Sequence, residues 1–447
     1  MSDFNISSTA AVWAGEENLF AEGAICLPVF NSVTFGYDDM DEWFDVALGR
    51  KKGHIYSRNT NPTVRPLEEK IRIMDGGEEA TSFSTGMAAI SNTLFTLLAP
   101  GERVVAVKDT YGGSNKIFIE FLPRMQVEVC LCDTSDFDAI EREVAKGCKV
   151  LYLETPTNPT LKIVDIERLA KAAHAVGAVV VVDNTFATPI NQRPLSLGAD
   201  VVVYSATKYL NGHSDVMGGL AVGRKDLIDR IFHYREITGA TLHPHSAYMI
   251  LRGMKTLELR IKRHNENGMR VATWLSQHPK VDQVFYPGLE THPNHDIARK
   301  QMRGFGGMLS FSLKGGFEKV VTVLENLKYA HKAASLGSVG TLVGPPRTTS
   351  HVELSEQERA NAGIPESLIR YSAGIEDGDD LIAVRYRHDA EQQISYTTVE
   401  LIVERKHKPP KTRAQALKQP IALVFVRVGF HEKDMQLAVK RAGGKWQ

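Results

Sequence analysis

The chain has 447 residues, of which 43% are hydrophobic and 24% are charged, and its formal net charge is zero. This composition is typical of a globular protein with two or three domains, and it gives no reason to expect a nucleic-acid or membrane partner. The four cysteines show neither paired CxxC spacing nor a His-rich neighbourhood, which argues against a zinc site or a disulfide framework.

The N-terminal stretch, residues 1–55, is predicted to form an arm with loops, and its acidic segment "YDDMDEW" is interpreted as solvated surface. The opening residues "MSDFNISSTAAVW" lack a basic region followed by an apolar run. No segment reaches the length of a membrane span. We therefore expect a cytoplasmic protein.

The next part of the chain, from about residue 80 to 225, alternates short β-branched runs with helical patterns. Its clearest strands are "RVVAVKD", "KVLYLET", "AVVVVDN" and "DVVVYSA". Each is nearly continuous in apolar residues, which indicates a strand covered on both faces. "DIERLAKAAHAVG", with Asp165 near its start and Gly177 just past its end, is predicted to be a helix between two such strands. The fold class is therefore α/β, with a mainly parallel sheet.

The C-terminal half changes character at about residue 246, where a long amphipathic pattern predicts a helix ending at His278 and Pro279. "GMLSFSLKGGFEKVVTVLENL" then predicts a strand followed by a helix, as in a smaller α+β domain. The tail is basic and contains a possible strand "IALVFVRV" and helix "EKDMQLAVKRAGG". We expect a large domain at residues 56–250, a small domain at 251–385 and an atypical basic extension at 386–447.

Functional-looking residues follow three of the predicted strands: Glu154, Asp183, and the group Ser205, Thr207 and Lys208. In open α/β sheets, ligands bind beyond the carboxyl ends of the strands, so these side chains are expected to face one crevice. An amine, a carboxylate and hydroxyls suit a phosphorylated, nitrogen-containing aromatic cofactor. Pyridoxal 5'-phosphate (PLP) is the obvious candidate.

A second element supports a phosphate site. "SFSTGMAAI" places Ser84, Thr85 and Gly86 between a strand and an apolar helix. Backbone N–H groups at a helix start, helped by the helix dipole, bind anions, and a glycine lets the backbone approach closely.

These residues occur in motifs that resemble a known family. "YSATKYLNGHSDVMGG", "YSRNTNPT", "STGMAA", "YGGSN", "ETPTNPT", "VDNTFATP" and "LIRYSAGIED" are similar to the Cys/Met-metabolism family of PLP-dependent enzymes. That family includes cystathionine γ-lyase, cystathionine γ-synthase, methionine γ-lyase and O-acetylhomoserine sulfhydrylase. The resemblance runs from about residue 10 to about 383 and implies the aspartate aminotransferase fold (fold type I). It also implies a homotetramer of two catalytic dimers.

The resemblance implies a role for each matching residue. Lys208 would hold the cofactor as an imine, Asp183 would pair with its pyridine nitrogen, and Tyr111 would stack on its ring. Tyr56 and Arg58 would reach the phosphate of the neighbouring subunit, so that the active sites are shared. The remaining implied cofactor contacts are Ser84, Gly86, Met87, Glu154, Asn158, Ser205 and Thr207.

On the substrate side, the resemblance implies that Arg370 holds the carboxylate of an amino-acid substrate by a bidentate pair. The backbone around Ser335 and Leu336 would assist it. The implied reaction is an α,γ-elimination on a γ-substituted L-amino acid, which gives a 2-oxo acid and ammonia or an unsaturated product. Lys208 would remove the α-proton while the pyridinium ring absorbs negative charge.

The segment "SLGSVGTLVGPPRTTSH", residues 335–351, bears on the substrate. Cystathionine γ-lyases and γ-synthases resemble "SLGGFESL" there, and Gly340 of this chain stands in place of their glutamate. Methionine γ-lyase carries a cysteine where this chain has Gly113. A γ-eliminating lyase is favoured, acting on a substrate that need be neither cystathionine nor methionine. The alternatives are a γ-replacing synthase or sulfhydrylase and a PLP-binding protein without catalysis.

Overall fold

The computed structural model describes residues 8–18, 20–352, 355–361, 363–382, 384–389 and 394–399. It contains two compact units, of which the first ends at Gly378 and the second begins at Asp379. The domain boundaries expected at residues 55, 250 and 385 stay predictions. The predicted tail elements "IALVFVRV" and "EKDMQLAVKRAGG" lie outside the described residues.

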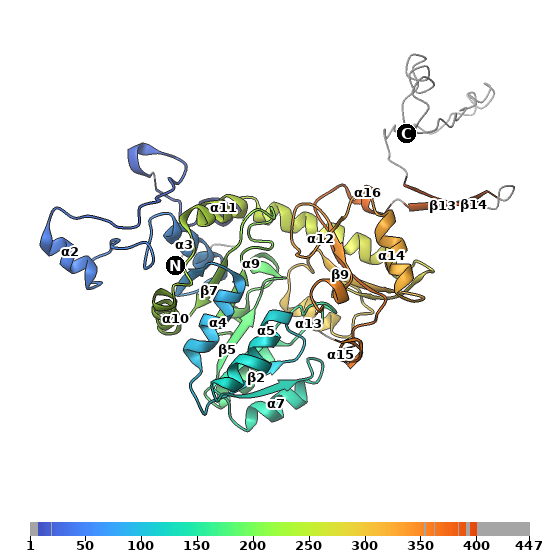
Figure 1. Cartoon of the computed structure of the whole chain (residues 1–447), viewed down its shortest axis with the longest axis horizontal. Coiled ribbons are helices and arrows are strands. Elements are labelled where there is room, and N and C mark those ends of the chain that lie inside the picture. The colour runs from blue at the N-terminus through green and yellow to red at the C-terminus, as the bar shows by residue number, and fades with distance from the viewer. Residues whose placement is uncertain are drawn as a thin grey trace, which may run out of the picture. The chain divides into compact units, whose positions relative to one another are not determined.

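The first unit is built on a seven-stranded sheet with the order β1-β7-β6-β5-β4-β2-β3 (Figure 1). Strands β6, β5, β4, β2 and β3 are parallel neighbours, whereas β7 is antiparallel to both β6 and β1. This confirms the mainly parallel sheet. The strands are β1 (Glu79–Phe83), β2 (Arg103–Val107), β3 (Glu128–Cys132), β4 (Val150–Glu154), β5 (Val179–Asp183), β6 (Val201–Ser205) and β7 (Gly219–Gly223).

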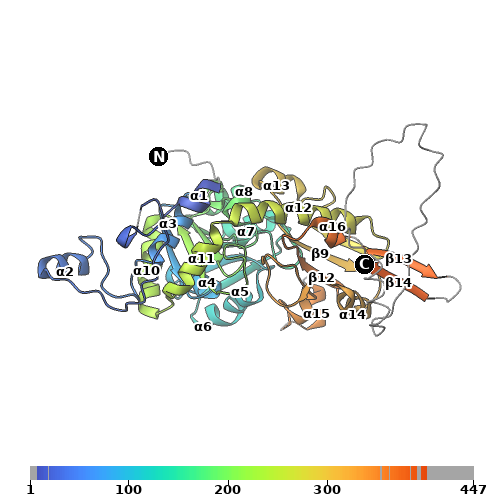
Figure 2. The same cartoon turned by 90° about the horizontal axis from the view of Figure 1, so that it is seen from above.

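Both faces of this sheet are buried, because successive side chains of a strand point to opposite faces. Val182 and Val202 pack in one core cluster, with residues of α3 (Val64–Asp75), α8 (Ile166–Ala175) and α11 (Pro244–Met254). Val181 and Val203 pack in a second cluster, with residues of α4 (Gly86–Leu97) and α10 (Lys225–Thr238). In Figure 2, α8 lies toward the top of the view and α4 below it, in agreement with their places in the two different clusters. The continuous apolar runs are thus explained.

Shorter helices complete the part of the chain around the large sheet. The helix predicted in "DIERLAKAAHAVG" is confirmed as α8, whose N-cap Asp165 accepts a hydrogen bond from Arg168 N. The others are η1 (Ala21–Gly23), α5 (Gly112–Lys116), the π-helix η2 (Ile117–Phe121), α6 (Leu122–Arg124), α7 (Phe137–Ala145), α9 (Thr188–Asn191) and η3 (Pro194–Leu197).

The N-terminal stretch differs from the prediction of an arm with loops, because it contains helices α1 (Ser8–Trp13) and α2 (Met40–Ala47). The acidic segment interpreted as solvated surface is largely exposed, as expected, and it also forms the start of α2. There Asp39 accepts hydrogen bonds from the N–H groups of Asp41 and Glu42. Acidic residues stabilise a helix N-terminus, which explains why this segment is helical.

The single helix predicted from residue 246 is also wrong in detail, because it consists of α11 and α12 (Leu257–Ser276). The break lies at Thr256, whose hydroxyl donates to Gly253 O at 3.2 Å. The guanidinium of Arg260 donates to the same carbonyl at 2.8 Å. Side chains that satisfy this carbonyl let α11 end there.

The second sheet of the first unit has the order β10-β11-β12-β9-β8, and α12 packs against β8 and β9. The predicted strand-helix pair is confirmed as β9 (Met308–Leu313) and α14 (Phe317–Asn326). The other elements are β8 (Val281–Phe285), α13 (His295–Gln301), β10 (His331–Lys332), β11 (Leu342–Gly344), η4 (Pro346–Thr348), α15 (Glu356–Asn361) and β12 (Leu368–Ser372). In the remainder, α16 (Gly378–Ile382) precedes an antiparallel pair, β13 (Val384–Asp389) and β14 (Ile394–Val399).

Candidate active site

The carboxyl ends of β4, β5 and β6 bring the predicted strand-end residues together. Glu154 is the register partner of Asp183, and Asp183 is the partner of Val203, two residues before Ser205. Lys208 follows in the turn after β6. The expected meeting of these groups at one edge of the sheet is therefore observed.

Lys208 is the amine of this site. Its Nζ donates a hydrogen bond to Ser335 Oγ at 2.8 Å. Burial, and then the positive charge of Arg370, lower the pKa of Lys208 to about 8. With this pKa, about a tenth of the amine is neutral at pH 7 and about half at pH 8, and the neutral form is the one that acts as a nucleophile or a base.

Arg370 lies on β12 of the second sheet, 6% exposed, and reaches the same cleft. Its Nη1 donates to Asn158 Oδ1 at 3.2 Å, and its Nη2 donates to Ser335 O at 2.9 Å. Burial lowers the pKa of Arg370 to about 10, so the group stays cationic. Ser335 thus contacts both Lys208 and Arg370, with its backbone at φ 90°. A carboxylate bound by Arg370 would lie close to the amine.

Two buried carboxyl groups lie at the base of the cleft. Asp183 Oδ1 accepts from Thr185 N at 2.9 Å, and Glu154 Oε2 accepts from Tyr111 N at 2.9 Å. Burial raises the pKa of both carboxyls, and the charge of Asp183 raises that of Glu154 further. Among the described residues no cationic side chain pairs with Asp183. A cationic ligand atom beside Asp183 would therefore be stabilised.

The start of α4 forms a cradle against the end of β6. A Cβ at Gly86 would lie 2.6 Å from Ser205 Cβ, so only glycine permits this approach. Thr85 Oγ1 caps the helix by accepting from Ala88 N at 3.0 Å. Within the described part of the chain, the N–H groups of Gly86 and Met87 have no acceptor. They remain available to an anion.

The other predicted phosphate contacts differ in their exposure and in the hydrogen bonds that they already make. Ser84 is exposed, and its N–H donates to Ala240 O at 3.1 Å. Ser205 is half-buried, and its N–H donates to Thr185 Oγ1 at 2.9 Å. The Thr207 hydroxyl exchanges hydrogen bonds with the backbone of Gly218, accepting from N at 3.1 Å and donating to O at 3.3 Å.

Tyr111 lies at the start of α5 and is 45% exposed. Gly113, where methionine γ-lyase carries a cysteine, faces the Tyr111 ring. A Cβ at Gly113 would lie 2.9 Å from Tyr111 Cε1 and 2.8 Å from Met87 Sδ. Tyr111 therefore stands beside the phosphate cradle. The hydrogen bond from its backbone N–H to Glu154 Oε2 fixes the position of the Tyr111 backbone.

Tyr56 and Arg58 contact each other at the surface of the chain. The Arg58 guanidinium lies over the Tyr56 ring, 5.4 Å from its centroid, and Tyr56 is 39% exposed. No hydrogen bond or ion pair joins either side chain to Lys208, Asp183 or Arg370 in the described part of the chain. They are free to contact a neighbouring molecule.

The substrate-side segment lines a cavity of about 980 Å³ that also includes Thr207. Ser335 and Gly340 lie on its wall, whereas the Leu336 side chain is buried in the core. A Cβ at Gly340 would meet only His331, at 3.8 Å, which is ordinary contact. The predicted substrate residue Gly340 therefore borders open space.

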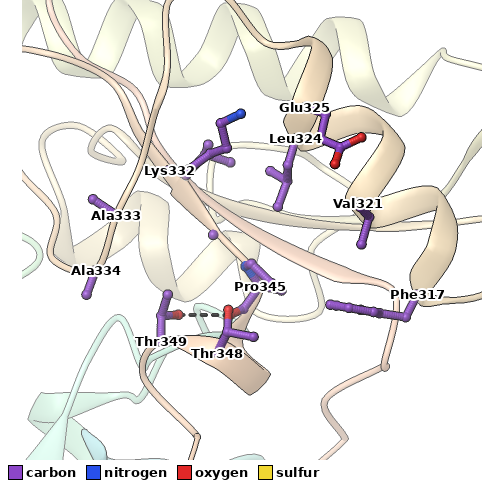
Figure 3. Close-up of a pocket in the computed structure, with 12 residues that line it drawn as sticks. Phe317, Val321, Leu324, Glu325, Lys332, Ala333, Ala334, Pro345, Thr348 and Thr349 are labelled. Carbon is purple, nitrogen blue, oxygen red and sulfur yellow. Dashed lines mark hydrogen bonds between the residues drawn. The ribbon is translucent and has the colours of Figure 1, made fainter.

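A second hollow, of about 380 Å³, lies outside this cleft (Figure 3). Phe317, Val321 and Leu324 of α14 form one wall, as Figure 3 shows. None of the predicted site residues lines it. It adjoins the substrate-side cavity, with which it shares the lining residues Lys332, Ala333 and Ala334.

Sequence reasoning missed two supporting contacts: the hydroxyl of Ser335, which accepts from Lys208, and Thr185, which donates to Asp183. Thr185 stands two residues after Asp183, a spacing at which an aspartate commonly accepts from the backbone, so this signal was present in the sequence. The Ser335 contact joins residues 127 positions apart and had no local signal.

These residues fit PLP. The cradle at Gly86 and the free amides suit its phosphate, the buried Asp183 suits a protonated ring nitrogen, and the partly neutral amine of Lys208 suits its aldehyde. In the described residues no group of three potential metal ligands occurs, and no helix is both long and apolar enough to cross a membrane.

The chain is similar to several known proteins. It is 46% identical over 379 residues to an L-methionine gamma-lyase of Fusobacterium nucleatum subsp. polymorphum. The aligned region covers 84% of this chain and 95% of that relative. It is 41% identical over 386 residues to a cystathionine beta-lyase of Coxiella burnetii, covering 86% and 96%. The crystal structure of cystathionine gamma-synthase from Xanthomonas oryzae pv. oryzae in complex with cystathionine superimposes with a TM-score of 0.80 at 39% identity, covering 84% and 95%.

A family model described as Cys/Met metabolism PLP-dependent enzyme matches residues 8–384, most of the first unit and the start of the second. This match and the relatives agree with the strand-end lysine, the buried aspartate and the phosphate cradle. The chain therefore belongs to the Cys/Met metabolism family of PLP-dependent enzymes, and PLP is its cofactor.

Proposed function

We propose that this enzyme catalyses α,γ-elimination on a γ-substituted L-amino acid, releasing a 2-oxo acid and ammonia. The observation that carries the proposal is the position of the Lys208 amine. It donates to the hydroxyl of Ser335, whose carbonyl accepts from Arg370, and its pKa is lowered to about 8. The similarity to proteins named L-methionine gamma-lyase, at 40–46% identity, supports elimination as the main reaction.

Lys208 is proposed to move the protons of the reaction. When bound, PLP supplies an electron sink for negative charge that develops on the substrate. Arg370 would bind the substrate carboxylate by two parallel hydrogen bonds, with Asn158 orienting its guanidinium. This places the substrate Cα near Lys208 Nζ, and the neutral amine can then accept the α-proton.

Asp183 and Tyr111 are proposed to orient the cofactor ring. The buried carboxylate of Asp183 would hold the ring nitrogen in its protonated form, in which the ring would be a stronger electron acceptor. Tyr111 would cover the ring, and Gly86, Met87, Ser84, Ser205 and Thr207 would surround the phosphate.

We also propose a homotetramer of two catalytic dimers, in which Tyr56 and Arg58 complete the neighbour's phosphate site. The N-terminal region supports association because it exposes large apolar side chains, including Met40, Trp43 and Phe44 of α2. Mixing an inactive Lys208→Ala variant with an inactive Arg58→Ala variant tests sharing. Hybrid dimers with one intact site would regain activity, whereas unshared sites would give none.

The substrate is proposed to lack a distal ammonium, because Gly340 leaves no carboxylate at the position where the resemblance implies a glutamate. Gly113 separates the chain from the cysteine-bearing pattern of methionine γ-lyase. A γ-substituted amino acid other than cystathionine is thus favoured.

A γ-replacement reaction is the second candidate, because relatives at about the same identity are named cystathionine gamma-synthase, for example one from Nicotiana tabacum at 40%. Purified enzyme should be incubated with cystathionine, methionine, homocysteine, canavanine, and O-acetyl- and O-succinylhomoserine, with and without a thiol. 2-Oxobutanoate released without thiol supports elimination. A thioether that suppresses the oxo acid identifies replacement and contradicts the proposal.

A further inference from the structure

Arg260 on α12 is a buried cation that the proposed reaction does not use. Only 4% of the Arg260 surface is exposed to solvent. Burial lowers its pKa to about 10, and no carboxylate among the described residues pairs with it. Burying an unpaired guanidinium is costly unless strong hydrogen bonds compensate, so its surroundings call for an explanation.

The guanidinium is compensated by backbone carbonyls on either side of it. Nη1 donates to Tyr209 O at 2.8 Å, and Nη2 donates to Leu210 O at 3.2 Å and to Gly253 O at 2.8 Å. Nε donates to Thr256 Oγ1 at 3.1 Å. Tyr209 and Leu210 are the two residues that directly follow Lys208, so Arg260 holds the turn that carries the reactive amine.

The turn is closed around the guanidinium. Lys208 N donates to Ser205 O at 3.2 Å, and Gly212 N donates to Lys208 O at 2.7 Å. Gly212 has φ 76°, and a Cβ at this position would lie 2.1 Å from Arg260 Nη1. The left-handed turn and the missing side chain are therefore both needed to admit Arg260.

Lys208 is thus held differently at its two ends. Its backbone is held on one side by β6 and on the other by Arg260, which binds the carbonyls of the next two residues. Its Nζ, in contrast, donates to one neutral partner, Ser335 Oγ. A lysine that moves protons must let its Nζ change partners while its Cα stays in place. A planar guanidinium spreads its donors over three nitrogen atoms in a rigid plane, so Arg260 reaches three carbonyls and a hydroxyl that lie apart, whereas an ammonium places all its donors on one atom.

We propose that Arg260 is a positioning residue that fixes the backbone of Lys208 during proton transfer. The inference rests on the proposed role of Lys208. Arg260→Lys keeps the positive charge and loses the three-point contact, so kcat should fall about tenfold or more while KM changes less than about twofold. The isotope effect with α-deuterated substrate should increase. The pH midpoint of the bound cofactor's absorption band should also shift.

Arg103→Lys is the matched control. Arg103 also donates to two carbonyls, Glu143 O at 2.7 Å and Gly147 O at 3.1 Å. It differs from Arg260 in pairing with the carboxylates of Glu128 and Glu143, and it begins β2 at the end of the sheet away from the site. It should leave kcat, the isotope effect and the absorption midpoint unchanged. An equal loss in both variants would overturn the inference, as would an Arg260→Lys enzyme with parental kcat and midpoint.

Thr256→Val is a milder variant for the case that Arg260→Lys does not fold. It removes the acceptor of Nε together with the hydroxyl's own hydrogen bond to Gly253 O, and it leaves the three carbonyl contacts of the guanidinium in place. It should shift the same quantities by a smaller amount; parental values would reject the proposal. Failure of the proposed function is distinguishable. A parent enzyme that releases no oxo acid rejects elimination, whereas the absorption midpoint, with borohydride trapping of the cofactor on Lys208, still tests Arg260.

Discussion

The two sides of the candidate active site differ in the room that their glycines leave. On the cofactor side, an added Cβ would lie 2.6 Å from Ser205 Cβ at Gly86 and 2.1 Å from Arg260 Nη1 at Gly212. On the substrate side, an added Cβ at Gly340 would meet its nearest neighbour, His331, at 3.8 Å. The cofactor side is closely packed at both glycines, whereas the substrate-side segment is open at Gly340 and closed at Gly337, where an added Cβ would lie 2.7 Å from Tyr209 N. We therefore expect position 340 to influence the choice of substrate.

The largest effect is expected on the cofactor side, from Lys208→Ala. Loss of the amine that holds the cofactor and moves the proton should lower kcat by at least about 10⁴-fold. The absorption band of the imine should disappear with it. Activity of purified Lys208→Ala near the parental value would remove the amine from the mechanism.

Arg370→Lys should give the next largest effect. The variant keeps a positive charge but loses the fork that contacts Asn158 and Ser335, so KM should rise roughly 10- to 100-fold. Steady-state kinetics measure this. A change in kcat alone, with KM unaltered, would be inconsistent with binding of the substrate carboxylate.

The pH dependence should follow the Lys208 amine, because only its neutral form accepts a proton. With its pKa lowered to about 8, kcat should rise with pH and level off above this value. Ser335→Ala removes the hydroxyl that accepts from Nζ and stabilises the charged amine, so the rise should move to lower pH. A profile that is flat from about pH 6 to 9 would contradict this assignment.

Gly86→Ala tests the tightness of the cofactor side more gently. The added methyl group collides with Ser205, which should cost about 1–3 kcal/mol of stability and weaken PLP binding. Thermal unfolding and cofactor titration measure the two quantities. Gly101→Ala is the control for a loss of stability away from the cradle: the φ of 85° strains an alanine there, but nothing lies within 4 Å of the added Cβ. An equal loss of PLP affinity in both variants would show that the cradle is not the cause.

Gly340→Glu should have the smallest effect on stability and tests the substrate side. The side chain has room in the cavity, so the unfolding midpoint should change little. Its carboxylate should raise the relative kcat/KM for cystathionine, which bears a distal ammonium, over a substrate without one. Gly340→Gln controls for size, and an equal change in both variants would mean that charge does not set the preference.

Much of the fold could be predicted from local patterns. The valine runs predicted strands buried on both faces, and Asp165 and Gly177 marked the ends of α8. The break between α11 and α12 could not be predicted, because it depends on Arg260 and Thr256 satisfying the carbonyl of Gly253. The helix α2 was missed because its acidic residues also suit an exposed loop.

The sequence by itself determined the family, the cofactor and the residue types at the strand ends, since these are carried by short motifs whose chemistry is local. The tertiary structure alone decided how those motifs are joined. The contacts of Lys208 with Ser335, of Arg370 with Asn158, and of Arg260 with the turn after Lys208 link residues 127, 212 and, for Tyr209, 51 positions apart. Such contacts arise from the packing of whole elements, so they cannot be predicted from the periodicity or the spacing of residues along the chain.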